Sequence, residues 1–282
     1  MITSLNNGRI KHAIQLREKS RVRNEEGLFV AEGFKMLEEA PASKIREIYC
    51  REDVWQRMEE SLKKAPPDRL LGLYEKILSC QKQGTVVEIV TQEVFRKLSD
   101  TQTPQGIFFL MEKMTYELPT LLRRAEKKKS DGKRPLFLVL EDIQDPGNLG
   151  TMIRTGEGAG VDGILMSKGT VDIYNPKTIR STMGSLYRVP FLYFDHMEDT
   201  IDQLKKAGIR VYAAHLKGTK SYREFHYEEG AAFLIGNEGN GLSEETAALS
   251  DEYIRIPMQG KLESLNAAVA AALLMYETAC SR

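Results

Sequence analysis

The chain has few cysteines, and their positions exclude two classes of small protein scaffold. Cys50, Cys80 and Cys280 are the only three in 282 residues, and no two of them form a CxxC pair. An odd number of scattered cysteines argues against a disulfide framework and against a cysteine-based zinc site. We therefore expect reduced thiols that behave as small buried apolar side chains.

Long apolar segments are also missing. The richest stretch, Ala267 to Met275, is short and dominated by alanine, whereas a membrane span needs roughly 18 apolar residues. The first fifteen residues, MITSLNNGRIKHAIQ, have no apolar core of the secretory type. These absences predict a cytoplasmic protein without a membrane partner.

Neither an excess of one charge nor a cluster of metal ligands is present. Forty basic and forty acidic side chains give a formal net charge of zero, so local clusters must decide whether a nucleic acid binds. The four histidines, at positions 12, 196, 215 and 226, are dispersed. We expect no metal site.

The length and one composition break predict two domains. The break is the charged run RRAEKKKSDGKRP, Arg123 to Pro135, which precedes the apolar LFLVLE. We expect a domain over residues 1–112, a linker helix and loop over 113–134, and a second domain over 135–282. Short apolar runs predict a mixed α/β first domain with strands at Leu28–Ala31, Lys44–Cys50, Thr85–Val90 and Gly106–Leu110.

The second domain alternates buried strands with helices, which predicts a parallel sheet that binds ligands beyond the carboxyl ends of its strands. We expect helices to begin near Leu149, Pro176, Met197, Ser243 and Ser264. The predicted strands are Leu136–Glu141, Gly163–Ser167, Val189–Tyr193, Ile209–Ala214, Ala231–Ile235 and Tyr253–Ile256.

The first candidate ligand loop is DPGNLGTMIRTGEGAG, Asp145 to Gly160. Asp-Pro-Gly forms a turn, and Asn148 is a plausible N-cap for the helix that follows. Helical spacing places Arg154 on a face of small residues together with Thr151, Thr155 and Gly158. A surface arginine beside a tightly packed helix is the alternative interpretation.

The second loop, FLIGNEGNGLSEE, is rich in glycine but unsuited to phosphate. It matches neither the dinucleotide motif nor the Walker motif. Glu238 in the loop, with Glu244 and Glu245 after the cap Ser243, would repel a polyphosphate. The pattern favours a ligand without phosphate, such as the cation S-adenosylmethionine, over a plain glycine-rich turn.

The third loop, within IPMQGKLESLNAAVAAALLMYE, follows a strand that ends at Ile256. Ser264 is a natural N-cap for the alanine-rich helix that follows. The small residues of this helix permit close packing within the chain or across a dimer.

Together the three loops resemble the motifs of the SpoU branch of the knotted RNA methyltransferases, the TrmH-like family. One departure is Gly156, where the family commonly has alanine. The matching segments are Asn148-x-Gly150-x-x-x-Arg154, Ile235-Gly236-Asn237-Glu238-Gly239-Asn240-Gly241-Leu242-Ser243, and Ile256-Pro257-Met258 continuing to Ser264-Leu265-Asn266.

The resemblance implies a fold, a cofactor and a site. Alternation alone predicts an unknotted parallel sheet, whereas the resemblance implies a C-terminal trefoil knot and a homodimer with its pocket at the subunit interface. It further implies transfer of a methyl group from S-adenosylmethionine to a ribose 2′-hydroxyl of RNA, without metal. The implied catalytic set is Arg154, Asn148, Glu238, Ser264 and Asn266, and the implied cofactor-binding set is Leu234, Gly236, Ile256, Met258 and Leu265.

The first domain resembles the ribosomal-protein-like substrate-binding domain of such enzymes, most clearly in KSRVRNEEGLFVAEG, Lys19 to Gly33. Six basic residues lie between Arg9 and Arg23, and they would neutralise RNA phosphates or form a solvated helix face. The predicted RNA contacts are Lys11, Lys19, Arg21 and Arg23. This domain favours a guanosine of large-subunit ribosomal RNA over transfer RNA as substrate.

Three alternatives remain open from sequence. The resemblance makes Arg154 the general base, but a guanidinium can equally stabilise a developing alkoxide while another group takes the proton. A nicotinamide-dependent oxidoreductase would need a G-x-G-x-x-G motif after the first strand, which is missing. A non-catalytic RNA-binding protein that retains the fold is the third.

Overall fold

The computed structural model describes residues 1–63, 66 and 68–280, and it divides into two compact units. Unit 1 contains Met1–Met114 and Tyr174–Tyr187. Unit 2 contains Thr115–Ile173 and the chain from Arg188 onward. The segment from Tyr174 to Tyr187, which the sequence places in the second domain, therefore belongs to unit 1 by its contacts.

Unit 1 is a four-stranded sheet with helices packed on it. The strand order is β1-β4-β2-β3, with β4 antiparallel to β1 and β2, and β2 parallel to β3. The four predicted strands are confirmed, with ends shifted by one or two residues: they are β1 (Leu28–Glu32), β2 (Ile45–Arg51), β3 (Val86–Val90) and β4 (Ile107–Glu112). The helices are α1 (Gly8–Glu18), α2 (Ser20–Glu26), α3 (Phe34–Glu39), α4 (Glu52–Ser61), α5 (Arg69–Lys82) and α6 (Gln92–Leu98).

The short helix α9 (Pro176–Thr182) joins unit 1 through the residues around it. Tyr174 packs its ring against Phe29, 4.6 Å between centroids, and its hydroxyl accepts a 2.7 Å hydrogen bond from the backbone N–H of Met114. Arg180 forms an ion pair with Asp100 at 3.2 Å. The segment packs against β1. Its apolar side chains are thereby removed from water.

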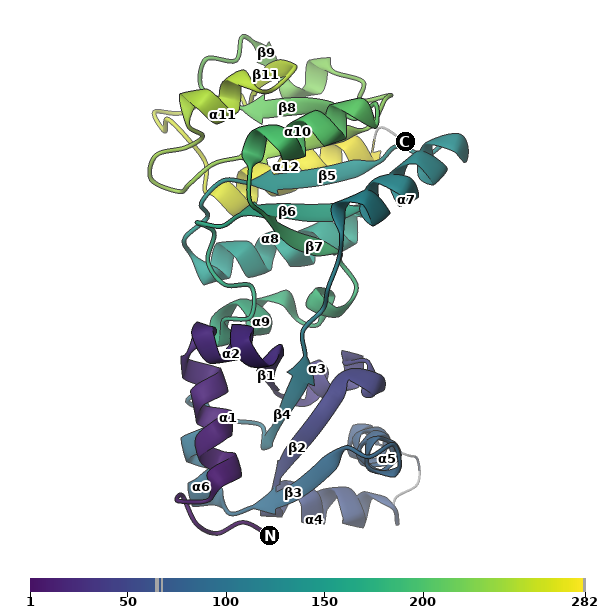
Figure 1. Cartoon of the computed structure of the whole chain (residues 1–282), viewed down its shortest axis with the longest axis vertical. Coiled ribbons are helices and arrows are strands. Elements are labelled where there is room, and N and C mark those ends of the chain that lie inside the picture. The colour runs from purple at the N-terminus through teal and green to yellow at the C-terminus, as the bar shows by residue number, and fades with distance from the viewer. Residues whose placement is uncertain (64–65, 67, 281–282) are drawn as a thin grey trace. The chain divides into compact units, whose positions relative to one another are not determined.

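Unit 2 is a seven-stranded sheet in the order β7-β6-β5-β10-β8-β11-β9, and every neighbouring pair is parallel (Figure 1). The predicted α/β class with a parallel sheet is therefore confirmed. The strands are β5 (Leu136–Leu140), β6 (Gly163–Ser167), β7 (Phe191–Phe194), β8 (Arg210–Ala214), β9 (Lys220–Ser221), β10 (Ala231–Ile235) and β11 (Glu252–Arg255). The helices are α7 (Leu118–Ser130), α8 (Pro146–Ala159), α10 (Met197–Lys206), α11 (Glu244–Ala248) and α12 (Ala267–Cys280).

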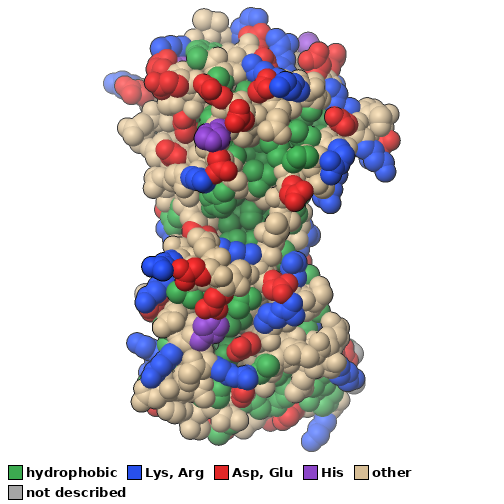
Figure 2. Space-filling view, viewed as in Figure 1, with side chains coloured by type: hydrophobic (Ala, Val, Ile, Leu, Met, Phe, Trp, Pro, Cys, Tyr) green, Lys and Arg blue, Asp and Glu red, His purple; other side chains and the backbone are tan. Residues whose placement is uncertain are grey.

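Helices cover both faces of this sheet, since its central strands are apolar on both sides. Figure 1 shows α10 in front of the sheet and α12 behind it. On the α10 side, Leu121 of α7 and Leu204 of α10 share a buried cluster with Phe137 and Val139 of β5. On the other side, α12 packs against β5, β10 and α8. Figure 2 shows hydrophobic side chains reaching the surface of unit 2 beside α7 and α10.

Two helix starts differ from the sequence predictions. Asp145, not Asn148, caps α8: its carboxylate accepts from the Asn148 N–H at 2.8 Å, and Pro146 takes the first helical position. Asn266, not Ser264, caps α12 by accepting from the Ala268 N–H at 2.9 Å. The linker stretch 113–134 is mainly helix α7, which is anchored in the core of unit 2 through its apolar face.

Residues of β8, β10, β11 and the segment between β11 and α12 line one cavity. The chain therefore runs from β11 to α12 past the carboxyl ends of β8 and β10. This is the path that a threaded C-terminal segment would take, and the trefoil knot itself stays a prediction. Within residues 1–63, 66 and 68–280, no helix is long and apolar enough to cross a membrane.

The described cysteines fit their predicted role. Cys50 and Cys80 are free and fully buried, and burial raises the pKa of the Cys50 thiol to about 12. The side chain of Cys280 lies outside the described part of the chain. In that described part, no three His, Cys, Asp or Glu side chains come together as a possible metal site.

Candidate active site

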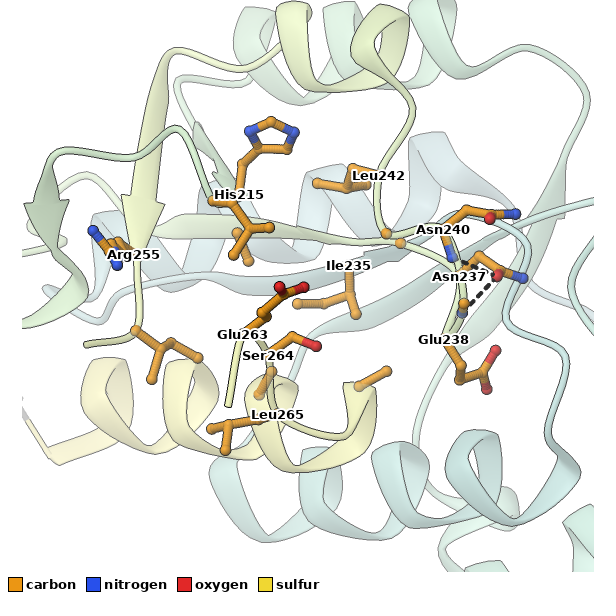
Figure 3. Close-up of a pocket in the computed structure, with 18 of the residues that line it drawn as sticks. His215, Ile235, Asn237, Glu238, Asn240, Leu242, Arg255, Glu263, Ser264 and Leu265 are labelled. Atoms are coloured by element: carbon orange, nitrogen blue, oxygen red, sulfur yellow. Dashed lines mark hydrogen bonds between the residues drawn. The ribbon is translucent and has the colours of Figure 1, made fainter. Parts of the chain in front are cut away.

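A cavity of 290 Å³ opens at the carboxyl ends of β8, β10 and β11 (Figure 3). It is formed by the second and third loops singled out from the sequence, together with the residues that follow β8. A parallel sheet delivers these loops to one edge, which is where such folds bind ligands. The lining residues are Ala214–Leu216, Ile235–Leu242, Ile254–Ile256, Met258, Glu263–Leu265, Ala267 and Ala270.

The loop after β10 is folded tightly on itself. The Gly241 N–H donates to the carbonyl of Asn237 at 2.9 Å, which closes the loop. A side chain at Gly236 would place its Cβ 2.1 Å from the backbone carbon of Gly241. Glycine is therefore required at position 236 because two backbone segments touch there.

The end of β5 braces the start of α11. Glu141 accepts hydrogen bonds from the Ser243 N–H at 2.8 Å, from the Ser243 hydroxyl at 2.7 Å and from the Thr246 hydroxyl. Ser243 also accepts from the Thr246 N–H at 3.1 Å, which confirms its predicted role as an N-cap. The loop is thus held at both ends, and its middle is left facing the cavity.

Glu238 turns away from the cavity toward the first loop (Figure 3). Its carboxylate accepts from the backbone N–H groups of Gln144 at 2.9 Å and Asp145 at 3.0 Å, and from the side-chain amide of Asn148 at 2.9 Å. Partial burial opposes ionisation, but the hydrogen bonds from Gln144, Asn148 and Asp145 prevail and lower the pKa of Glu238. Glu238 is thus a fixed anion that joins two loops.

Three of the five predicted catalytic side chains form one hydrogen-bonded chain. Asn266 donates from its side-chain amide to the Asn148 Oδ1 at 3.0 Å, and Asn148 donates to Glu238 at 2.9 Å. Because Glu238 can only accept when ionised, it fixes the orientation of both amides. The network brings together one residue from each of the three loops.

Replacing Glu238 with glutamine is expected to loosen this junction. A neutral amide has one acceptor oxygen for three donors, and these hydrogen bonds are exposed to solvent, so we expect a loss of about 0.5–1.5 kcal/mol of stability. The pKa of Glu238 is lower in the folded protein than in the unfolded chain, so its contribution is full above the unfolded pKa of about 4.3 and is lost as the pH falls through the folded value.

Denaturation midpoints of both proteins between pH 3 and pH 7, measured by urea titration, would check this. The gap between wild type and Glu238→Gln should close at the acid end. A gap that is unchanged throughout would contradict the role of the ionised carboxylate.

The remaining two predicted catalytic residues occupy different places. Ser264 is exposed and lines the cavity. Arg154 projects from the exposed side of α8, does not line the cavity, and has no hydrogen bond or ion pair to any described residue. Thr151, Thr155 and Gly158 share its side of the helix, with Thr151 and Gly158 exposed and Thr155 half-buried. The predicted small-residue face is therefore confirmed, with a free guanidinium on it.

Four of the five predicted cofactor-binding residues line the cavity: Gly236, Ile256, Met258 and Leu265. The fifth, Leu234, does not line the cavity, and its role in cofactor binding stays a prediction. It is fully buried in the cluster on the α10 side of the sheet, because side chains alternate along β10, and the next residue, Ile235, reaches the cavity instead.

Two groups in the cavity were given no functional role from the sequence. Glu263 lies within it beside Ser264, and Figure 3 shows its carboxylate directed toward the interior. His215 lines the opposite side, and its position just beyond a predicted strand was the one available signal. Glu263 precedes the motif by one residue, and no spacing rule distinguishes it from an ordinary surface glutamate.

The chemistry of the cavity fits S-adenosylmethionine. Gly236 presents bare backbone to the cavity, and Leu242 and Leu265 add apolar contacts for a flat ring. The charged side chains among the lining residues are Glu238, Arg255 and Glu263, and Glu263 offers a negative charge to a cationic ligand. The carboxylate of Glu263 would repel a pyrophosphate.

The four predicted RNA contacts divide into two kinds. Lys11, Lys19 and Arg21 are exposed on α1 and α2 or at the junction between them. Arg23 is only 3% exposed, and its guanidinium donates to the carbonyls of Leu16 at 2.7 Å and Arg17 at 3.0 Å. The prediction for Arg23 is therefore wrong: it satisfies the free carbonyls at the end of α1.

Two family models match this chain. The SpoU rRNA Methylase family matches residues 135–276, and the MRM3-like substrate binding domain matches residues 7–108. The first covers all three loops and the cavity. The second lies within unit 1.

Relatives match along almost the whole length. The 23S rRNA (guanosine(2553)-2′-O)-methyltransferase RlmP of Bacillus subtilis is 31% identical over 277 residues, covering 98% of this chain and 97% of that protein. The crystal structure of an AdoMet-bound rRNA methyltransferase from Sinorhizobium meliloti is 28% identical, has a TM-score of 0.79, and covers 98% of this chain and 96% of that one. The chain belongs to the SpoU rRNA methylase family and is an RNA methyltransferase that uses S-adenosylmethionine.

Proposed function

We propose that this enzyme methylates the ribose 2′-hydroxyl of a guanosine in large-subunit ribosomal RNA. The observation that carries the proposal is the hydrogen-bonded chain Glu238–Asn148–Asn266, which joins the three family motifs beside the cavity. The similarity to a methyltransferase of 23S rRNA guanosine supports the choice of RNA and base. The cytoplasm is the compartment in which such an RNA is available.

When bound, S-adenosylmethionine supplies an electrophilic methyl group. The backbone around Gly236, Ile256 and Leu265 would hold the cofactor, and Glu263 would offer it a negative charge. Asn148 and Asn266, oriented by Glu238, and the hydroxyl of Ser264 direct the ribose. Arg154 either accepts the hydroxyl proton or stabilises the alkoxide that forms.

Unit 1 is proposed to hold the RNA. Lys11, Lys19 and Arg21 present exposed cations that can neutralise phosphates. Such contacts fix the position of an RNA without reading its sequence. The match of residues 7–108 to a substrate binding domain supports this role.

The active enzyme is proposed to be a homodimer formed through α12. Val269, Leu273 and Tyr276 are exposed along one side of this helix at helical spacing, with exposed fractions of 49%, 36% and 46%. The hydroxyl of Tyr276 approaches the bare backbone of Gly158, so this apolar stripe adjoins the face of α8 that carries Arg154. A second copy seated on α12 would cover the stripe and enclose Arg154.

Leu273→Asp is expected to dissociate this dimer, because burying an unpaired carboxylate in an apolar interface is costly. Sedimentation equilibrium should give twice the chain mass for wild type and one chain mass for the variant. The exposed Leu262→Asp, in the loop before α12, serves as the matched control. A monomeric wild type with full activity would contradict the proposal.

The reaction is tested by labelled methyl transfer to total RNA, followed by nucleoside mass spectrometry. We expect 2′-O-methylguanosine in large-subunit RNA. The same label in transfer RNA would favour the alternative substrate, and a methylated base would contradict the reaction class. No transfer to any RNA would indicate a non-catalytic RNA-binding protein.

A further inference from the structure

One residue beside the cavity adopts a backbone conformation that L-amino acids rarely adopt. Asp142, just after β5, has φ of +53°. Non-glycine residues pay a cost in this region and are kept there when the surroundings determine them. Asp142 belongs to neither the predicted catalytic set nor the cavity lining.

The surroundings hold Asp142 by its side chain. The Ser167 hydroxyl at the end of β6 donates to the Asp142 carboxylate at 2.6 Å and accepts from the Asp142 N–H at 2.8 Å. Gly169 leaves space for this carboxylate, because a Cβ at position 169 would lie 2.1 Å from the Asp142 Oδ1. The ends of the neighbouring strands β5 and β6 thus hold Asp142 in place.

The left-handed conformation directs the carbonyl of Asp142 toward the cavity loop. This carbonyl accepts from the side-chain amide of Asn237 at 2.8 Å. The same side chain accepts from the backbone N–H groups of Gly239 at 2.8 Å and Asn240 at 3.2 Å, as the dashed lines in Figure 3 show. Asn237 therefore transmits the position of Asp142 to the backbone of the loop.

We propose that Asp142, held by Ser167 and Gly169, is a positioning residue that sets the shape of the loop 237–241 for cofactor binding. The inference rests on the assignment of this cavity to S-adenosylmethionine. Asp142 acts through Asn237 and does not itself line the cavity. Its loss should therefore weaken cofactor binding while the rest of the fold persists.

Two substitutions reach this contact from opposite sides. Asp142→Ala removes the carboxylate and leaves a non-glycine residue at a positive φ. Gly169→Ala keeps the carboxylate but pushes it out of the space that Gly169 leaves free. We expect each to raise the Kd for S-adenosylhomocysteine about tenfold, which is the factor that the loss of about 1.4 kcal/mol gives. Because both disable one contact, the double variant should be no weaker than the worse single variant.

Conservative and control variants separate positioning from general stability. Asp142→Asn tolerates the left-handed conformation and keeps an acceptor for Ser167, so its Kd should stay within about twofold of wild type. Gly156→Ala adds a methyl group at an ordinary contact distance of 3.5 Å and should also leave binding unchanged. Should Asp142→Ala fail to fold, Asp142→Gly removes the side chain without backbone strain and should still weaken binding.

Isothermal calorimetry with S-adenosylhomocysteine, thermal melting and steady-state kinetics on the full chain complete the test. Positioning predicts that KM for S-adenosylmethionine rises by a larger factor than kcat falls. A Kd within twofold of wild type for folded Asp142→Ala and Gly169→Ala, or an Asp142→Asn protein as weak as Asp142→Ala, would overturn the inference. Failure of wild type to bind would instead refute the assignment of the cavity.

Discussion

Arg154→Ala is expected to lower kcat by about 10²–10³-fold or more, the loss seen when one transition-state donor is removed. The Kd for S-adenosylmethionine should stay within about twofold of wild type, because Arg154 does not line the cavity. No described residue pairs with this guanidinium, so the structure leaves it available for substrate. Single-turnover methyl transfer and calorimetry measure the two effects separately.

Arg154→Lys distinguishes the two proposed roles of the arginine. A lysine keeps the positive charge, so an electrostatic role predicts partial activity and an unchanged pH–rate profile. A proton acceptor with a different pKa predicts a shifted profile. Arg123→Ala, on an exposed arginine of α7, is the matched control and should retain activity. A fully active Arg154→Ala enzyme would remove this residue from the mechanism.

Gly236→Ala is expected to weaken cofactor binding by about 100-fold or more. The new Cβ would lie 2.1 Å from both the Gly241 carbon and the Leu242 nitrogen, and these backbone atoms cannot turn aside as a flexible side chain can. The loop must open, and it carries both the cavity wall and Glu238. Calorimetry with S-adenosylhomocysteine should show the Kd rise by about 100-fold or more, which corresponds to about 2.7 kcal/mol.

Gly239→Ala provides a control in the same loop. Its nearest neighbour would be the Asn237 Oδ1 at 3.4 Å, an ordinary contact. Binding by this variant should stay within about threefold of wild type, a change of less than 1 kcal/mol. Equal losses of cofactor affinity in both variants would contradict the explanation that Gly236 is required because two backbone segments touch there.

The strands of both units were predictable because their apolar runs are short and bounded by turns. Gly163–Ser167 and Ala231–Ile235 were predicted with their observed bounds. The strand order could not be predicted, since the alternation of strands and helices does not say which strands pair. The placement of Tyr174–Tyr187 in unit 1 depends likewise on contacts distant in sequence.

Site residues were predictable where a characteristic residue type stands at a characteristic position of a loop. The motifs named Asn148, Glu238 and Asn266, but only the structure shows that they form one hydrogen-bonded chain. Two of the three capping assignments, Asn148 and Ser264, failed by three and two residues, because several polar residues precede each of these helices and any of them could cap it. Arg23 failed because a basic cluster does not reveal which of its members point inward.

Soaking crystals of the protein in S-adenosylhomocysteine is the most direct test that the cofactor lies in this cavity. We expect electron density for the adenosine against the backbone of residues 236–242 and 256–265, with the amino-acid part near Glu263. An empty cavity at saturating ligand, or the ligand bound elsewhere in the chain, would contradict it.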